Sequence, residues 1–237
     1  MKKTMIAGLM SALILTVGQS GLMVKAQDQA QMRYTEDITE FQVEEGSVVD
    51  FENVKIPENL VETLQTGGNI IVFRYTGAGG PASPVDAQAG QNIKDDGQRI
   101  SQESIEKMQA YGQVFKDLNI PINRVVSSEY YFVWQHAMAA FDNPILISRD
   151  LTGSLDFSDS QELAQSLQNL RNRTVTAPEE GTNTIYFTHQ GKFDKAYGYY
   201  PPAGTTLIFR PDGSNKAQLI AVLSYDQLID LANQVDQ

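Results

Sequence analysis

Three apolar runs of the sequence each end in a polar side chain of a kind that binds anions or moves protons. These side chains are Arg74, Ser128 and His189. Because the carboxyl ends of parallel strands share one edge of an open α/β sheet, we expect the three to lie close together. An arginine that ends an apolar run is costly to bury unless an anion neutralises it. The arginine therefore needs an anionic partner, which is either a ligand or a side chain of the protein. The alternative partners of the arginine are three carboxylates of the chain, Asp86, Asp95 and Glu129.

Alternating strands and helices must position these side chains. Apolar runs predict strands at 70–73, 124–128, 144–147 and 184–188, and a hairpin of strands at 206–209 and 219–222. Helical spacing and capping residues predict helices from Asn59, Ser101, Tyr130, Asp159 and Ser224. This order predicts a three-layer α/β/α domain with a mostly parallel mixed sheet and an antiparallel C-terminal hairpin. The segment 76–97, rich in Gly and Pro, is predicted to be a long functional or mobile loop.

The N-terminal residues are typical of a secretory signal peptide. Lys2 and Lys3 precede a short apolar run, and small residues follow it as far as Ala26. The run is shorter than the ~20 apolar residues that cross a bilayer. We therefore expect cleavage after Ala26 and a periplasmic or secreted protein, with no cysteine to carry a lipid anchor.

Composition limits the partners of the chain. Its 237 residues have a formal net charge of −11, so nucleic acid and anionic membranes are poor partners, and a phosphorylated ligand needs a locally positive pocket. Residues 27–57 are acidic and are predicted to form an extended or loosely packed arm before a single domain at 58–237. The chain has no cysteine and only two histidines, far apart in the sequence, so we expect neither a metal site nor another cofactor.

The three strand ends, taken in order, resemble the histidine phosphatase superfamily, particularly its phosphoglycerate-mutase-like branch. They read Phe73-Arg74-Tyr75-Thr76-Gly77, Val126-Ser127-Ser128-Glu129-Tyr130 and Phe187-Thr188-His189-Gln190-Gly191. The resemblance extends from about residue 60 to residue 233 and includes the helix start at 99–101 and the hairpin turn at 209–213. Its specificity comes from the collinear order of these segments.

The resemblance implies a pocket for a phosphoryl group. In family members, Arg-His-Gly follows the first strand, where the histidine attacks phosphorus and the arginine holds the phosphate oxygens. A second arginine on the next helix and a second histidine after the late strand complete a cationic cradle. On this chain the resemblance places phosphate contacts at Arg74 and His189, and it places Tyr75 at the position of the nucleophile.

Several positions depart from the family pattern. Tyr75 replaces the nucleophilic histidine, Thr76 the next glycine, and Phe132 the second arginine, while Glu129 and Trp134 replace a proline and a further arginine. A tyrosine hydroxyl, with a pKa near ~10, is almost wholly protonated at neutral pH. An aromatic ring cannot supply the bidentate hydrogen bonds of a guanidinium. We therefore expect little or no phosphatase activity.

The other histidine of the sequence, His136, lies one turn after Phe132. It could line the pocket and replace the lost positive charge, but a surface or capping role is favoured. The phosphate-binding candidates are therefore Arg74, Tyr75 and His189. The further pocket candidates are Thr76, Ser128, Phe132 and His136.

Three functions remain open. The first is an exported pseudophosphatase that binds a small phosphorylated or other anionic ligand through Arg74, His189 and the hydroxyl of Tyr75. The second is a divergent phosphomonoesterase in which His189 or His136 acts as the nucleophile. The third is a protein-interaction module that works through the acidic arm.

Overall fold

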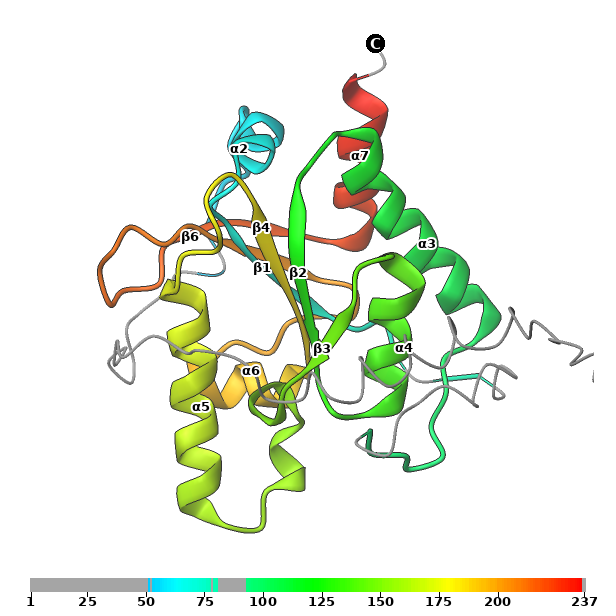
Figure 1. Ribbon diagram of the computed structural model, residues 1–237, viewed down its shortest axis with the longest axis vertical. Coiled ribbons are helices and arrows are strands. Elements are labelled where there is room, and N and C mark those ends of the chain that lie inside the picture. The colour runs from blue at the N-terminus through cyan, green and yellow to red at the C-terminus, as the bar shows by residue number, and fades with distance from the viewer. Residues whose placement is uncertain (1–50, 52, 78, 81–92, 236–237) are drawn as a thin grey trace, which may run out of the picture.

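The computed structural model describes residues 51, 53–77, 79–80 and 93–235. The predicted signal peptide at 1–26, and all of the predicted arm before residue 51, lie outside the described residues. The described chain forms a six-stranded sheet in the order β3-β2-β4-β1-β5-β6, with helices packed on both faces (Figure 1). The predicted α/β class, the mixed sheet and the antiparallel C-terminal hairpin are confirmed.

The elements follow the predicted order. The strands are β1 (Ile70–Arg74), β2 (Ile122–Ser127), β3 (Ile145–Ile147), β4 (Asn183–Thr188), β5 (Thr206–Phe209) and β6 (Leu219–Leu223). The α-helices are α2 (Leu60–Thr66), α3 (Gln102–Asp117), α4 (Tyr131–Ala140), α5 (Ser160–Val175), α6 (Gln190–Tyr197) and α7 (Tyr225–Val235), with short 3-10 helices η2 (Arg149–Leu151) and η3 (Ser154–Asp156). None of the helices in the described part of the chain has the length and apolar composition that crossing a bilayer requires.

The central strand is β4, whose six residues are all buried. It pairs in parallel with β1 on one side, where Thr188 lies opposite Arg74, and with β2 on the other, where Phe187 lies opposite Ser127. The strand β1 also pairs antiparallel with β5, which joins the C-terminal hairpin to the sheet. The register therefore brings the carboxyl ends of β1, β2 and β4 to one edge.

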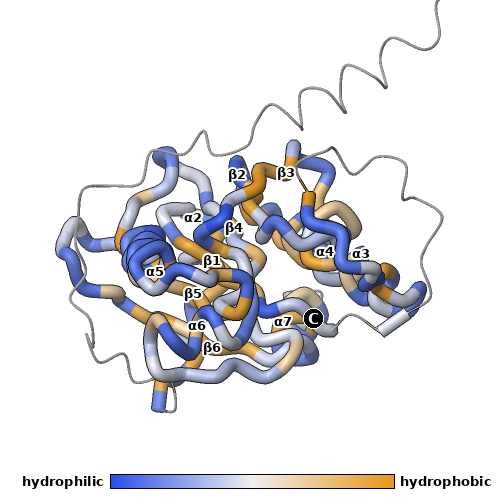
Figure 2. Tube along the Cα trace, turned by 90° about the horizontal axis from the view of Figure 1, so that it is seen from below, coloured by the Kyte–Doolittle hydropathy of each residue, from blue (hydrophilic) through white to orange (hydrophobic). Residues whose placement is uncertain are grey.

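The two faces of the sheet bury two apolar cores. Successive side chains of a strand point to opposite faces, so Ile71 and Phe73 of β1 pack under α3, α4 and α7. Ile70 and Val72 pack instead on the face that α5 and α6 cover. Seen from below, the apolar strands lie between these two helical layers (Figure 2). On the first face, α3 and α4 approach so closely at Gly112 that an added Cβ would lie 1.7 Å from the carbonyl oxygen of Ala140.

The helix starts that the sequence predicted from capping residues are confirmed. The hydroxyl of Ser101 accepts a hydrogen bond from the backbone N–H of Ser104, at 3.1 Å. The carboxylate of Asp159 accepts two, from the N–H groups of Gln161 and Glu162. These bonds satisfy N–H groups that have no partner within the helix.

The described end of the acidic arm is packed against the domain. Phe51 is buried and its ring stacks on Tyr199, with the centroids 4.6 Å apart. It also meets Phe193 and Tyr197 edge-on. At this residue the prediction of a loosely packed arm is wrong, because an aromatic side chain within the acidic segment completes the core beneath α6.

Candidate functional site

The structure brings the predicted strand ends together. Tyr75, which follows β1, lies with its ring centroid 5.3 Å from that of His189, which follows β4. The Oγ of Ser128, which follows β2, lies 2.8 Å from Nε2 of His189. Arg74 is close enough to His189 to act on its pKa. The candidate site therefore combines residues from three neighbouring strands.

His189 is neutral and its ring is hydrogen-bonded. Burial is the main cause that lowers its pKa, to about 3, and the positive charges of Lys192 and Arg74 lower it further. Ser128 Oγ also accepts a hydrogen bond from the backbone N–H of Tyr130, at 3.2 Å.

His136 is wholly buried, so the predicted surface role is wrong. Its Nδ1 lies 2.6 Å from the carbonyl oxygen of Phe132 and must donate, because a carbonyl only accepts. Its Nε2 then accepts from the hydroxyl of Thr76, at 3.0 Å. Burial lowers the pKa of His136 to about 4. The ring contacts Tyr75, with centroids 5.7 Å apart, but it does not replace the lost positive charge.

The guanidinium of Arg74 lies over the ring of Tyr75. Its guanidinium carbon lies 4.8 Å from the ring centroid, and Nη1 donates to the carbonyl oxygen of Tyr75 at 2.6 Å. Among the described residues, no carboxylate forms an ion pair with Arg74. Asp95 pairs with Arg99, and Glu129 with Arg149; Asp86 lies outside the described residues. Desolvation by burial lowers the pKa of Arg74.

A pocket of about 250 Å³ opens beside these residues. Tyr75, Tyr130 and Phe132 give it aromatic walls, so Phe132 lies in the pocket but brings no charge there. His189 also lines it, whereas Arg74, Thr76, Ser128 and His136 are not among the lining residues. The other lining residues are Asp96, Gln98, Gly153, Ser154, Leu155, Asp156, Gln190, Gly191 and Lys192. Trp134 lies away from the pocket, packed against Tyr131.

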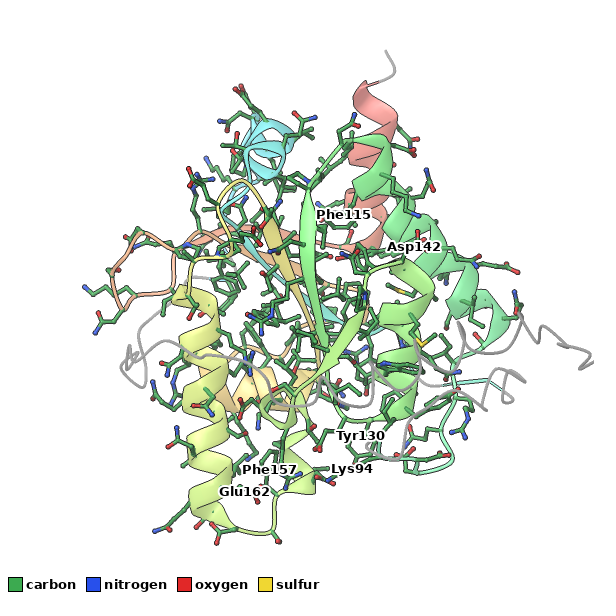
Figure 3. All side chains as sticks on the ribbon, viewed as in Figure 1. Lys94, Phe115, Tyr130, Asp142, Phe157 and Glu162 are labelled. Atoms are coloured by element: carbon green, nitrogen blue, oxygen red, sulfur yellow. The ribbon has the colours of Figure 1, made fainter. Side chains whose placement is uncertain are left out.

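An ion-pair network that the sequence did not reveal supports one wall of the pocket. Asp156 contacts Lys94, accepts from Arg149 at 2.9 Å, and accepts from the hydroxyl of Tyr130 at 3.1 Å. Arg149 also pairs with the buried Glu129, at 3.1 Å. Figure 3 shows Lys94 and Tyr130 together at the lower end of the molecule, near Phe157 and Glu162. The network fixes Tyr130 and neutralises Asp156.

Lys192 is the second functional candidate that the sequence reading missed. It is wholly buried, lines the pocket, and lies with its ammonium 3.9 Å from the ring centroid of Phe157 and in contact with Ser166. Burial lowers its pKa to about 7. The available signal was its position in the first turn of the helix that begins after His189.

A larger cavity, of about 370 Å³, lies beside the amino ends of β1, β2 and β4. Arg124 and Arg173 line it, and Arg173 is held by Ser148 and Asp150 at 2.9 and 3.0 Å. None of the predicted site residues lies there. The candidate site at the carboxyl edge of the sheet occupies the position where ligands of open α/β folds bind.

The two neutral histidines predict a loss of stability in acid. Because their folded pKa values, about 3 and about 4, lie below the ordinary 6.5, the unfolded chain binds more protons between these values. Their contribution is present above pH 6.5 and is lost as the pH falls toward 4, by on the order of 3 kcal/mol for each histidine. We expect the double variant H136N/H189N, which has no histidine, to lose less unfolding free energy between pH 6.5 and pH 4 than the wild type does, as measured by urea denaturation. If the difference in unfolding free energy between wild type and variant stayed the same from pH 7 to pH 4, the conclusion that both folded histidines are neutral would be contradicted.

No model of a known protein family matches the chain, and no curated protein matches it. Solved structures do match. The chain is similar to the protein histidine phosphatase SixA complexed with tungstate, with 14% identity and a TM-score of 0.45 over 68% of this chain and 99% of that one. It is also similar to a phosphoserine phosphatase from Entamoeba histolytica in complex with 3-phosphoglyceric acid, with 12% identity and a TM-score of 0.43 over 68% and 98%. A mycobacterial glucosyl-3-phosphoglycerate phosphatase matches with 13% identity and a TM-score of 0.41 over 64% and 96%.

Proposed function

We propose that the protein is an exported, catalytically inactive member of the histidine phosphatase superfamily that keeps a pocket for a small phosphorylated or other anionic ligand. The observation that carries this proposal is the position of Tyr75. Its ring lies between His189 and His136, at 5.3 and 5.7 Å, where the resemblance places the phosphate-accepting histidine.

The surroundings of Tyr75 oppose phosphoryl transfer. Burial raises the pKa of its hydroxyl, so the phenolate that could attack phosphorus is scarce at neutral pH. Phe132 supplies no hydrogen bond to a phosphoryl oxygen, and removal of one such donor typically costs about 2.7–4 kcal/mol of transition-state stabilisation. A histidine nucleophile of the rival phosphomonoesterase would need a free lone pair directed into the pocket. The lone pair of His136 is instead held by the hydroxyl of Thr76, and His136 is not one of the residues that line the pocket.

The electrostatics of the pocket floor support anion binding. Lys192 and Arg74 lower the pKa of His189, and each has a larger effect than Asp156, which raises it. Among the charges that act on His189, the two cations thus outweigh the carboxylate, in a chain whose net charge is −11. Arg74 is partly buried, and none of the described carboxylates pairs with it, so an anion near His189 would stabilise its charge.

The proposal of export rests on residues 1–26, which lie outside the described part of the chain. A charged start, a short apolar run and small residues before Gln27 are the features of a cleaved signal peptide. We expect N-terminal sequencing of protein recovered from the periplasm or the medium to begin at or within a few residues of Gln27. Recovery of uncleaved protein in the cytosol alone would exclude export.

Enzymatic assay tests the proposed inactivity. We expect the purified mature protein to leave p-nitrophenyl phosphate unhydrolysed from pH 4 to pH 9, because it lacks both the nucleophile and the second arginine. We expect Y75H alone to gain no turnover, since Phe132 still provides no clamp. Wild-type turnover that is abolished by H189A and kept by Y75F would establish the rival phosphomonoesterase.

Thermal unfolding tests the anion pocket. Phosphate at a concentration tenfold above its Kd is expected to raise the melting temperature by roughly 3–6 °C. We expect R74Q to abolish this rise. R210Q is the matched control, because Arg210 contacts Gly67 and Asn69 at the amino end of β1, away from the pocket. An equal rise in wild type, R74Q and R210Q would place the bound phosphate elsewhere.

A further inference from the structure

Four rings on the pocket lining form one ring cluster, Tyr75, Tyr130, Phe132 and His189. The centroids of Tyr75, Tyr130 and Phe132 lie 5.3, 5.5 and 5.8 Å from that of His189. The centroid of Phe132 also lies 5.1 Å from that of Tyr75 and 5.6 Å from that of Tyr130. The imidazole is therefore part of the aromatic wall, and a group that binds beside it has the other rings next to it.

Gly153 leaves the edge of the His189 ring that bears Nδ1 uncovered. A Cβ built at Gly153 would first meet Nδ1, at 3.4 Å, and both residues line the pocket. Nε2, the other ring nitrogen, is paired with Ser128 Oγ. Nδ1 forms no hydrogen bond with any residue that the structure describes. It is therefore a polar atom of the ring cluster that a ligand can contact.

Leu155 extends the apolar lining to the mouth of the pocket. Its side chain is 98% exposed, although it lines the same pocket as the ring cluster. The short helix η3 that carries it is held in place at Asp156, which contacts Lys94 and accepts from Arg149. Because removing apolar surface from water is favourable, a ligand that covers Leu155 gains binding energy from it.

The contacts of His189 within the ring cluster limit the shape of the ligand. Because the imidazole touches the rings of Tyr130 and Phe132 directly, an anion beside His189 and an apolar group beside those rings must be adjacent in the ligand. The volume of about 250 Å³ lies below the ~300–1,000 Å³ of pockets for drug-sized ligands. A compact anion bonded to a single ring meets both conditions.

A flat ring suits this lining better than an alkyl group. Aromatic pairs prefer edge-to-face or offset contacts with centroids ~4.5–7 Å apart, and these contacts are favourable beyond the area that they bury. The ring cluster already packs in this way, since Tyr75 meets Phe132 at an interplanar angle of 70° and His189 at 75°. A further ring between the cluster and Leu155 continues the same packing.

We infer that the pocket binds a small aryl phosphate. Its phosphate lies beside Nδ1 of His189, and its aromatic ring packs between the ring cluster and Leu155. The phosphate half of this assignment rests on the proposed function. The aromatic half is new and rests on the ring contacts and on the exposed leucine.

Calorimetric titration with three phosphate monoesters tests the aromatic half. Methyl, cyclohexyl and phenyl phosphate carry the same anion and differ in the group attached to it. At pH 7.5 we expect the full mature chain to bind phenyl phosphate more tightly than methyl phosphate, by on the order of tenfold, because the ring buries apolar surface. It should bind phenyl phosphate about threefold more tightly than cyclohexyl phosphate, because only the aromatic ring makes edge-to-face contacts.

Two variants separate the halves of the site. L155A should lower the affinity for phenyl phosphate and leave that for methyl phosphate unchanged, and the fold should tolerate it because Leu155 is exposed. I56A is the matched control and should keep the wild-type ratio, since Ile56 is also exposed and its neighbour Pro57 lines a different cavity with Arg210. G153A, which adds a methyl group beside Nδ1 of His189, should weaken the binding of all three esters.

The outcomes separate this inference from the function on which it rests. Equal affinity of the wild type for phenyl and methyl phosphate overturns the aromatic half and leaves the anion pocket intact. No binding of any ester overturns both. Equal affinity for phenyl and cyclohexyl phosphate overturns the preference for a flat ring, and a ratio lost equally in L155A and I56A overturns the role of Leu155. Unchanged binding by G153A overturns the placement of the phosphate. Binding of a phosphotyrosine peptide without binding of phenyl phosphate overturns the assignment to a small compound.

Discussion

The register of β4 between β1 and β2 is the constraint on which the site depends. It sets Thr188 opposite Arg74 and Phe187 opposite Ser127, so the residues that follow the three strands meet at one edge. Because side chains alternate between the faces of a sheet, a slip of one residue would turn β4 over and bury polar groups in the wrong core. The two faces of β4 carry different side chains, Ile185 and Phe187 in one core and Tyr186 in the other, and this difference fixes the register. The position of His189 is thus determined by the packing of the sheet.

The same packing determines the chemistry of the two imidazoles. Both lie where an imidazolium would lose its hydration, and nearby cations oppose a further positive charge. Each ring remains neutral and forms a hydrogen bond with a hydroxyl, Ser128 for His189 and Thr76 for His136. Tyr75 then packs between them as an apolar ring. A site that resembles a phosphoryl-transfer centre in sequence is therefore, physically, an aromatic cluster with one arginine behind it.

Local patterns in the sequence predicted the strands, the capped helices and the meeting of Arg74, Tyr75 and His189, because each of these depends on periodicity or on a strand end. The contribution of Asp156 could not be predicted in this way. It comes from a 3-10 turn that is fixed by contacts with Lys94, distant in the sequence, and with Arg149. Lys192 was missed because a lysine in an amphipathic helix ordinarily points to solvent. The burial of Phe51 depends on Phe193 and Tyr199, which only the folded chain brings near it.

The acidity of the whole chain opposes the approach of a simple anion to the pocket. A phosphate dianion approaches a protein of net charge −11 against a repulsive field, and only cations near the pocket, such as Arg74, offset that repulsion. Salt screens the long-range repulsion beyond about 10 Å at 0.1 M, but it affects desolvated contacts less. The field of the chain therefore disfavours simple anions most at low ionic strength, and added salt weakens this repulsion more than it weakens the contacts within the pocket.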